Sequence, residues 1–236
     1  MNEIVQSFWV GSDLSAMVYL SISSFLKNGH EYHLYTYGDV GNIPPGTVVR
    51  DAAEILPRSM IFQYREHKTY SAFSNFFRYK LLLEKGGWWI DTDLVCVRSF
   101  DFPDEYVFSS ETAVEKEFVN AGAIKVPAGS EPMAYAWSIC ESKNREALVW
   151  GEIGPQLVGE VITKFSLDKS VKRPHVFCPL GYRDWQKVLD PDFTWQFDEG
   201  THAIHLWNEL WRRSGQDKNQ RYHSDCLYEK LRRQYC

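Results

Sequence analysis

The sequence predicts an α/β fold built on a sheet that begins with parallel strands, and two stretches of the chain carry this prediction. Near the N-terminus, a strand at residues 3–9, a helix at 14–27 and a strand at 31–37 follow one another within about 35 residues. Such a stretch is typical of a βαβ unit with a right-handed crossover. Further on, residues 71–97 combine an amphipathic helix, a Gly-Gly stop and a strand that ends in acids.

The remaining elements follow from the same periodicities. The helix at 14–27 is expected to be capped by Ser12 or Asp13. Shorter strands are expected at 47–50, 106–111, 118–124, 176–179 and 201–207, further helices at 131–142 and 155–164, and a loop-rich segment at 182–197. The length suits a single domain over residues 1–236, whose last part, 211–236, is a basic aromatic tail.

Composition narrows the possible functions. A formal net charge of −5 argues against broad nucleic-acid binding. The five cysteines are scattered and form no Cys-x-x-Cys pair, so neither a disulfide framework nor a zinc site is expected. The N-terminus has no basic signal region, and no apolar run is long enough to span a membrane. These features together predict a cytoplasmic protein.

The stretch SAFSNFFRYKLLLEKGGWWIDTDLVCV, residues 71–97, contains the most informative pattern. Its helix is expected to begin at Ser71 or Ser74, either of which is a suitable N-cap, and to end at Gly86. The helix is predicted by apolar side chains at helical spacing, namely Phe73, Phe76, Phe77 and Leu81.

Asp91 and Asp93 follow this strand and predict a metal site. In an extended segment residues i and i+2 point the same way, so the two carboxylates are expected to lie together. Two neighbouring carboxylates repel each other unless a cation lies between them, and a hard divalent ion with oxygen ligands suits such a place. A second Asp-x-Asp triplet, residues 190–192, contains a proline and is interpreted as a surface loop.

The motif SNFFRYKLLLEKGGWWIDTD, residues 74–93, resembles the sugar-binding region of glycosyltransferase family 32 and its relatives. Asn75 stands where that family often has aspartate; its amide can still accept a hydrogen bond from a hydroxyl but carries no charge. The resemblance implies a GT-A-like, Rossmann-like nucleotide-sugar-binding fold with a mixed central sheet. It also implies an enzyme that moves a hexose from a UDP- or GDP-sugar with retention of configuration.

The same resemblance implies roles for individual residues. The donor would be held by Phe8, Trp9, Gly11, Ser74, Asn75, Arg78, Asp91 and Asn120. The metal, Mn²⁺ or Mg²⁺, would be held by Asp91, Asp93 and His205, the last from a His-x-Trp segment. The residues implied to act in catalysis are Asp91, Asp93, Arg78, Asn120 and Gln156.

Each of these roles has a structural alternative. Trp9 is equally interpretable as a core residue, and Arg78 as a surface arginine that pairs with Glu84 or Asp101. Asn120 stands among small residues that a tightly packed strand would also use, and His205 is alternatively a core histidine bonded to a backbone carbonyl.

The most specific hypothesis is a metal-dependent, retaining glycosyltransferase whose acceptor is a hydroxyl of a polysaccharide or glycolipid. The tail at 211–236 holds seven Lys or Arg against three acids and is interleaved with aromatic residues. It suggests a peripheral contact with the inner face of a membrane, although a charged closing helix explains it too. A metal-dependent hydrolase of nucleotide sugars or phosphate esters and a non-catalytic sugar-binding module remain as rival functions.

Overall fold

A mixed six-stranded sheet forms the centre of the protein, of which the computed structural model describes residues 3–236. The strand order is β3-β2-β1-β4-β7-β6, with the first four strands parallel and β7 and β6 antiparallel to their neighbours. The α/β fold and the mixed sheet are therefore confirmed. The strands are β1 Val5–Trp9, β2 Tyr32–Thr36, β3 Val48–Asp51, β4 Gly87–Ile90, β6 Val107–Ala113 and β7 Lys116–Val126.

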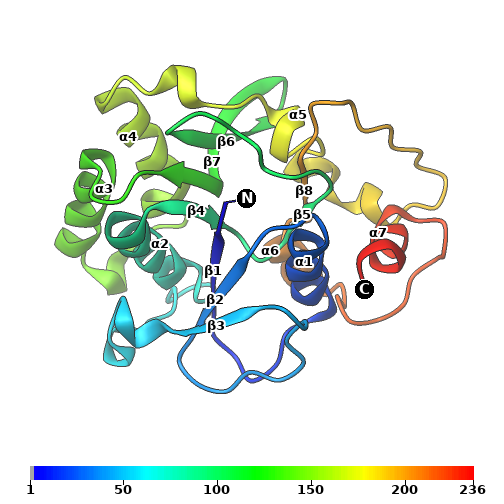
Figure 1. Ribbon diagram of the computed structural model, residues 1–236, viewed down its shortest axis with the longest axis horizontal. Helices are drawn as coiled ribbons and strands as arrows, with labels where there is room; N and C mark the ends of the chain where they lie inside the picture. Colours follow the sequence, from blue (N-terminus) through cyan, green and yellow to red (C-terminus); the bar gives the residue numbers. More distant parts are fainter. Residues whose placement is uncertain (1–2) are drawn as a thin grey trace.

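Helices cover both faces of this sheet (Figure 1). The longer helices are α1 Ala16–Lys27, α2 Ser71–Lys85, α3 Glu131–Ser142 and α4 Leu157–Lys164. Successive residues of β4 show the two-sided burial: Trp88 belongs to the same buried cluster as Phe25 of α1, whereas Trp89 belongs to the cluster that contains residues of α2, α3 and α4. Because both rings are buried, the Trp-Trp pair fixes the sheet between its two helical layers.

The parallel β1–α1–β2 unit agrees with the prediction, but its helix cap does not. The N-cap of α1 is Ser15, whose side chain accepts a hydrogen bond from the Val18 backbone N–H, so the helix begins later than expected from Ser12 or Asp13. Helix α2 begins at Ser71 after Tyr70, and no side chain caps it, so the prediction of a serine cap is wrong.

Gly86 ends α2 for two physical reasons. Its φ of +62° lies in the left-handed region, which glycine adopts without a steric penalty. A Cβ at this position would also come within 2.3 Å of the Ala128 backbone nitrogen. The chain can therefore turn directly from α2 into β4, and this turn brings the acids that follow β4 back toward the helix.

A second, two-stranded sheet joins distant parts of the chain. Strand β5 (Leu94–Cys96) pairs antiparallel with β8 (Ala203–His205), and Leu94 is the register partner of His205. Residues 91–94 form a tight turn closed by the Leu94 N–H and the Asp91 carbonyl at 3.1 Å, so the two acids do not lie in an extended segment as expected. They converge through the turn instead.

The C-terminal part also differs from expectation between residues 174 and 197. The strand predicted at 176–179 is wrong, because Pro174 opens a short helix there, and part of the predicted loop at 182–197 is helical. The short helices of the molecule are α5 Pro174–Phe177, α6 Asn208–Arg213, η1 Ala52–Glu54, η2 Arg58–Met60, η3 Arg145–Ala147, η4 Glu152–Gln156, η5 Asp168–Ser170 and η6 Tyr182–Leu189.

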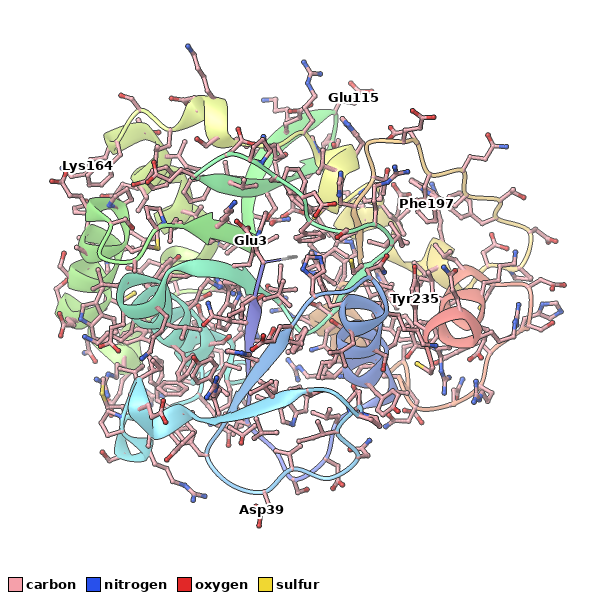
Figure 2. The ribbon with its side chains drawn as sticks, in the orientation of Figure 1. Glu3, Asp39, Glu115, Lys164, Phe197 and Tyr235 are labelled. Carbon is pink, nitrogen blue, oxygen red and sulfur yellow. The ribbon has the colours of Figure 1, made fainter. Side chains whose placement is uncertain are left out.

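The tail closes the fold as helix α7 (Leu227–Tyr235), which lies beside α1 (Figure 1). Its apolar residues Tyr228 and Leu231 are buried, and Tyr235 lies between the two helices (Figure 2). Because these apolar side chains pack inside the protein, they are not available to contact a membrane, and the structure does not support the predicted membrane contact of the tail. Within residues 3–236, no helix combines the length and the apolar character needed to cross a bilayer.

Candidate active site

A cavity of about 680 Å³ lies where β1 and β4 end, between α2 and the segment from β8 to α6. It brings together most of the residues singled out from the sequence. Nine of them line it: Phe8, Trp9, Ser74, Asn75, Arg78, Asp91, Asp93, Asn120 and His205. Gly11 and Gln156 are not among its lining residues.

Arg78 and Asp91 form an ion pair at the wall of this cavity, in which Arg78 is buried and Asp91 is half-buried. Arg78 Nη2 donates to Asp91 Oδ1 at 2.7 Å, and Arg78 Nη1 donates to Asn75 Oδ1 at 2.6 Å. Trp89 Nε1 also donates to Asp91 Oδ1, at 2.8 Å, and its ring lies beneath the guanidinium. Arg78 therefore pairs with neither Glu84 nor Asp101, and one oxygen of Asp91 is held from two sides.

Asp93 is held by the segment that follows β8. Its Oδ1 lies 3.2 Å from His205 Nε2, and its Oδ2 accepts from the Asn208 backbone N–H at 2.8 Å. Trp207 has a left-handed φ of +58° and stacks its ring on the His205 imidazole at 3.8 Å. The chain thus turns sharply after β8 and fixes the imidazole against the acid.

Asp91, Asp93 and His205 each direct a ligand atom to one place, and these three atoms lie within 4.8 Å of one another. The neighbouring Gly122 makes room for this arrangement, since a Cβ there would meet Leu94 Cδ1 at 3.1 Å and His205 Cε1 at 3.4 Å. The absence of a side chain at Gly122 therefore leaves room for the histidine ring.

The charges of this cluster are unevenly compensated. Burial raises the pKa of Asp91, Arg78 offsets this only in part, and the neighbouring charge of Asp93 raises it further. Burial acts in the same direction on Asp93, but the positive charge and hydrogen bond of His205 bring its pKa below the usual value. For His205, burial favours the neutral ring, yet Asp93 holds its pKa well above 6.5. Asp91 therefore retains a negative charge that the protein stabilises poorly, which suits a bound cation.

Strand β1 ends at the same cavity with Phe8 and Trp9. Phe8 is buried and stacks on Phe77 at 4.3 Å, so it is mainly a core residue. Trp9 is half-buried, and its Nε1–H is enclosed without a hydrogen-bond partner in the protein. Gly11 lies beyond it on the surface. The structure thus offers one free donor at this end of the cavity.

Asn120 lies in β7 and is almost fully buried. Its Oδ1 accepts from Ser109 Oγ and from the Gly122 backbone N–H, and its Nδ2 donates to Cys178 Sγ at 3.0 Å. Most of its hydrogen-bonding capacity therefore serves the local strand geometry, and one amide hydrogen remains for a ligand.

Gln156 is exposed where η4 meets α4, outside the cavity wall. The neighbouring Glu152 pairs with Lys143 at 2.6 Å, as a solvated loop residue would. This segment reaches the cavity through other residues, Trp150, Gly151 and Pro155.

Several lining residues were not recognised from the sequence. Glu111 of β6 enters the cavity from the far edge of the sheet, and Arg213 of α6 lies over the Trp150 ring at 4.5 Å. Tyr182 and Arg212 complete this part of the wall. For Glu111, the sequence offers one signal: it is the carboxylate that ends the otherwise uncharged segment FSSE in the strand predicted at 106–111.

Two family models match the chain, in ranges that together take in most of it. Residues 22–112 match the glycosyltransferase sugar-binding region containing the DXD motif. Residues 142–236 match the alpha 1,4-glycosyltransferase conserved region. Asp91 and Asp93 lie in the first range and His205 in the second.

Curated relatives are named as glycosyltransferases as well. Mouse lactosylceramide 4-alpha-galactosyltransferase is 25% identical over 67% of this chain and 46% of its own length. Human alpha-1,4-N-acetylglucosaminyltransferase is 22% identical over 67% of this chain and 48% of its own length. The chain thus spans about half the length of the curated relatives it matches.

Solved structures show the same fold at low identity. The PaToxG glycosyltransferase matches with a TM-score of 0.55 and 15% identity, over 100% of this chain and 86% of that one. The galactosyltransferase LgtC, solved with donor and acceptor sugar analogs, matches with a TM-score of 0.50 and 11% identity, over 98% and 96%. The fold is therefore of the GT-A type, and the chain is a glycosyltransferase in which residues 22–112 match the DXD-containing sugar-binding region, in agreement with its resemblance to family 32.

Proposed function

We propose that this enzyme transfers a hexose from a UDP- or GDP-sugar to a hydroxyl of a glycan or glycolipid, with a divalent metal and with retention of configuration. One observation carries the proposal: Asp91, Asp93 and His205 converge within 4.8 Å in a cavity of about 680 Å³. Since the chain is a glycosyltransferase, the non-catalytic sugar-binding alternative is set aside.

The donor would lie across the ends of β1 and β4. Trp9 offers its unpartnered Nε1–H at the β1 end, where the nucleotide would bind. Arg78 uses both terminal nitrogens on Asn75 and Asp91, but its buried Nε–H has no partner in the protein. A buried donor without a partner is costly, so we infer that a hydroxyl or phosphate oxygen of the donor satisfies it.

The metal would be held by Asp91, Asp93 and His205. The residues fit a divalent ion, because two carboxylates and one imidazole surround one point, and the partial charge compensation of Asp91 leaves room for a cation. When bound, Mn²⁺ or Mg²⁺ would neutralise charge on the departing nucleoside diphosphate. Arg78 and Trp89 would orient Asp91, and Asn208 and Trp207 would orient Asp93 and His205.

The acceptor is proposed to be a glycan or glycolipid, since curated relatives are named for lactosylceramide and for the addition of sugars in α-1,4 linkage. Retention of configuration rests on the family resemblance, and NMR of the product's anomeric proton would test it. The proposal of a cytoplasmic enzyme rests on its five cysteines, which are unpaired in the structure.

A panel of nucleotide sugars tests this function. UDP-galactose, UDP-glucose, UDP-N-acetylglucosamine and GDP-mannose would be incubated with the enzyme, manganese and acceptor glycosides, and nucleotide release would be compared with glycoside product. Sugar transferred to the acceptor supports the proposal, whereas free sugar alone in the presence of acceptors would favour the rival hydrolase.

Matched variants assign the activity to the metal cluster. Asp91→Ala and Asp93→Ala are expected to abolish transfer and to weaken manganese-dependent nucleotide binding. Asp190→Ala and Asp192→Ala, in an exposed turn, are expected to leave both unchanged. Near wild-type turnover in Asp91→Ala or Asp93→Ala would remove that residue from the metal site.

A further inference from the structure

Glu111 lies on β6, the edge strand of the central sheet, and its side chain lines the cavity. Its Oε2 is buried and has no hydrogen-bond partner. The other carboxylates that line the cavity within residues 3–236 are all engaged: Asp91 by Arg78, Asp93 by His205 and Glu209 by Arg212 and Arg213. Among the cavity carboxylates of residues 3–236, Glu111 is thus the one that has no ion pair and whose unpartnered oxygen is buried.

The surroundings of Glu111 compensate the negative charge of its carboxylate only in part. Burial raises the pKa of Glu111, and the positive charge of His205 offsets the increase only in part. Buried acceptors without partners are rare in native proteins, and a bound ligand, ion or water is one explanation for such a group. A ligand hydroxyl that donates to Oε2 would therefore satisfy the side chain.

The order of the strands relates the position of Glu111 to the proposed donor site. Across the cavity, Trp9 comes from β1, Asp91 follows β4, Asn120 comes from β7 and Glu111 from β6. Neighbouring strands lie about 4.8 Å apart, so Glu111 is roughly 14 Å of sheet width from the β1 end. If the nucleotide binds beside Trp9 and the metal beside Asp91, Glu111 lies beyond the donor on the acceptor side.

Space for an acceptor continues past Glu111. A second cavity, of about 530 Å³, shares Glu111, Pro155 and Tyr182 with the first. It runs along the β6–β7 hairpin, whose outer tip carries Glu115 (Figure 2). An acceptor larger than one sugar can therefore leave the reaction centre in this direction.

We propose that Glu111 is the acceptor-recognition residue of this enzyme: its free carboxylate oxygen accepts a hydrogen bond from a hydroxyl of the acceptor sugar. The inference rests on the proposed transfer to a sugar hydroxyl. It assigns Glu111 a role in acceptor choice and affinity, separate from the donor contacts of Arg78 and the metal cluster.

Acceptor kinetics of three variants test it. Glu111→Ala and Glu111→Gln would be compared with Glu117→Gln, an exposed glutamate on the paired strand β7. With manganese and the preferred nucleotide sugar, KM would be measured for the p-nitrophenyl glycosides of galactose, lactose, glucose and N-acetylglucosamine. Thermal unfolding would confirm that each variant is folded.

The acceptor KM of Glu111→Ala is expected to rise about tenfold or more, while the donor KM stays within about twofold. Glu111→Gln is expected to change the order of preferred acceptors, because an amide donates as well as accepts hydrogen bonds. Glu117→Gln should match the wild type. Unchanged acceptor KM and order in both Glu111 variants would overturn the proposal, as would a rise in donor KM alone.

If the wild-type enzyme uses none of the nucleotide sugars, the proposed function is refuted, and the acceptor role of Glu111 needs a test that does not depend on turnover. Acceptor binding would then be measured by saturation-transfer NMR, with p-nitrophenyl β-lactoside, UDP and manganese. Loss of the lactoside signal in Glu111→Ala, against an unchanged signal in Glu117→Gln, would support the acceptor role. Equal signals in the wild type and Glu111→Ala would exclude it.

Discussion

Replacing Arg78 by lysine keeps the positive charge but removes the planar fork that joins Asn75 to Asp91. The guanidinium spans both partners, at 2.6 and 2.7 Å, from a site where the side chain is 4% exposed. A single ammonium has no rigid fork with which to reproduce both bonds, so the substitution is expected to lose at least one charged hydrogen bond. We predict that Arg78→Lys folds but loses metal-supported turnover.

The size of the loss follows from the geometry. A hydrogen bond to a charged group contributes about 1.5–3 kcal/mol, which corresponds to about a 10- to 150-fold change in rate if it is needed in the transition state. A comparable range, about 10- to 100-fold, is typical when a residue that orients a metal ligand is removed. Asp91 is a proposed metal ligand, and without Arg78 its one remaining side-chain donor would be Trp89.

The assay is nucleotide release from the preferred donor over a manganese titration, which gives both kcat/KM and the apparent metal affinity. Arg50→Lys, at an exposed position on β3, is the matched control and should leave both values unchanged. Unchanged kcat/KM and manganese affinity in Arg78→Lys would show that only the charge of Arg78 matters and would refute the argument from its planar geometry.

Other substitutions test neighbouring features. Asn75→Asp should keep turnover within a few-fold, because its carboxylate can still accept from Arg78, and a folded but inactive variant would contradict this. His205→Ala should weaken manganese binding measured with UDP or GDP present, and unchanged affinity with unchanged turnover would remove it from the metal site. In metal-free protein, the extra thermal stability of the wild type over His205→Gln should be largest between about pH 4 and 6.5. It should shrink as pH rises through the raised folded pKa of His205, and also as pH falls through the lowered folded pKa of Asp93; a constant difference would contradict the ion pair. Leu231→Ala, in buried α7, should cost about 2–5 kcal/mol in chemical denaturation, and a near-zero cost would mean that α7 docks weakly.

Elements with a local cause were predicted well from the sequence. The end of α2 at Gly86 and the strand after it follow from a left-handed glycine and two buried tryptophans, so their positions agree closely with expectation. The same local reasoning failed at the start of α1, where Ser12, Asp13 and Ser15 are all chemically suitable caps and only the packing of the helix selects Ser15.

The composition of the site was less predictable, because it depends on contacts between distant residues. Asp91 and Asp93 converge as expected, but through a tight turn rather than through the alternation of a strand. His205 was predicted as a metal ligand only from the family resemblance. No local sequence signal indicates that residue 205 pairs with residue 94 in the structure. Glu111 was missed for the same reason: only the order of strands in the sheet brings the end of β6 to the cavity.

The short pairing of β5 with β8 has a consequence for how the active protein is assembled. Asp91 and Asp93 would leave the ribosome more than a hundred residues before His205, so the growing chain holds only part of the proposed metal cluster until β8 has been synthesised and docked. Neither of the two matched regions, 22–112 or 142–236, contains the complete cluster. Any cation held by all three residues would link the last third of the chain to its middle third, and would slow amide hydrogen exchange in β8 and α6 as well as in the turn at 91–94.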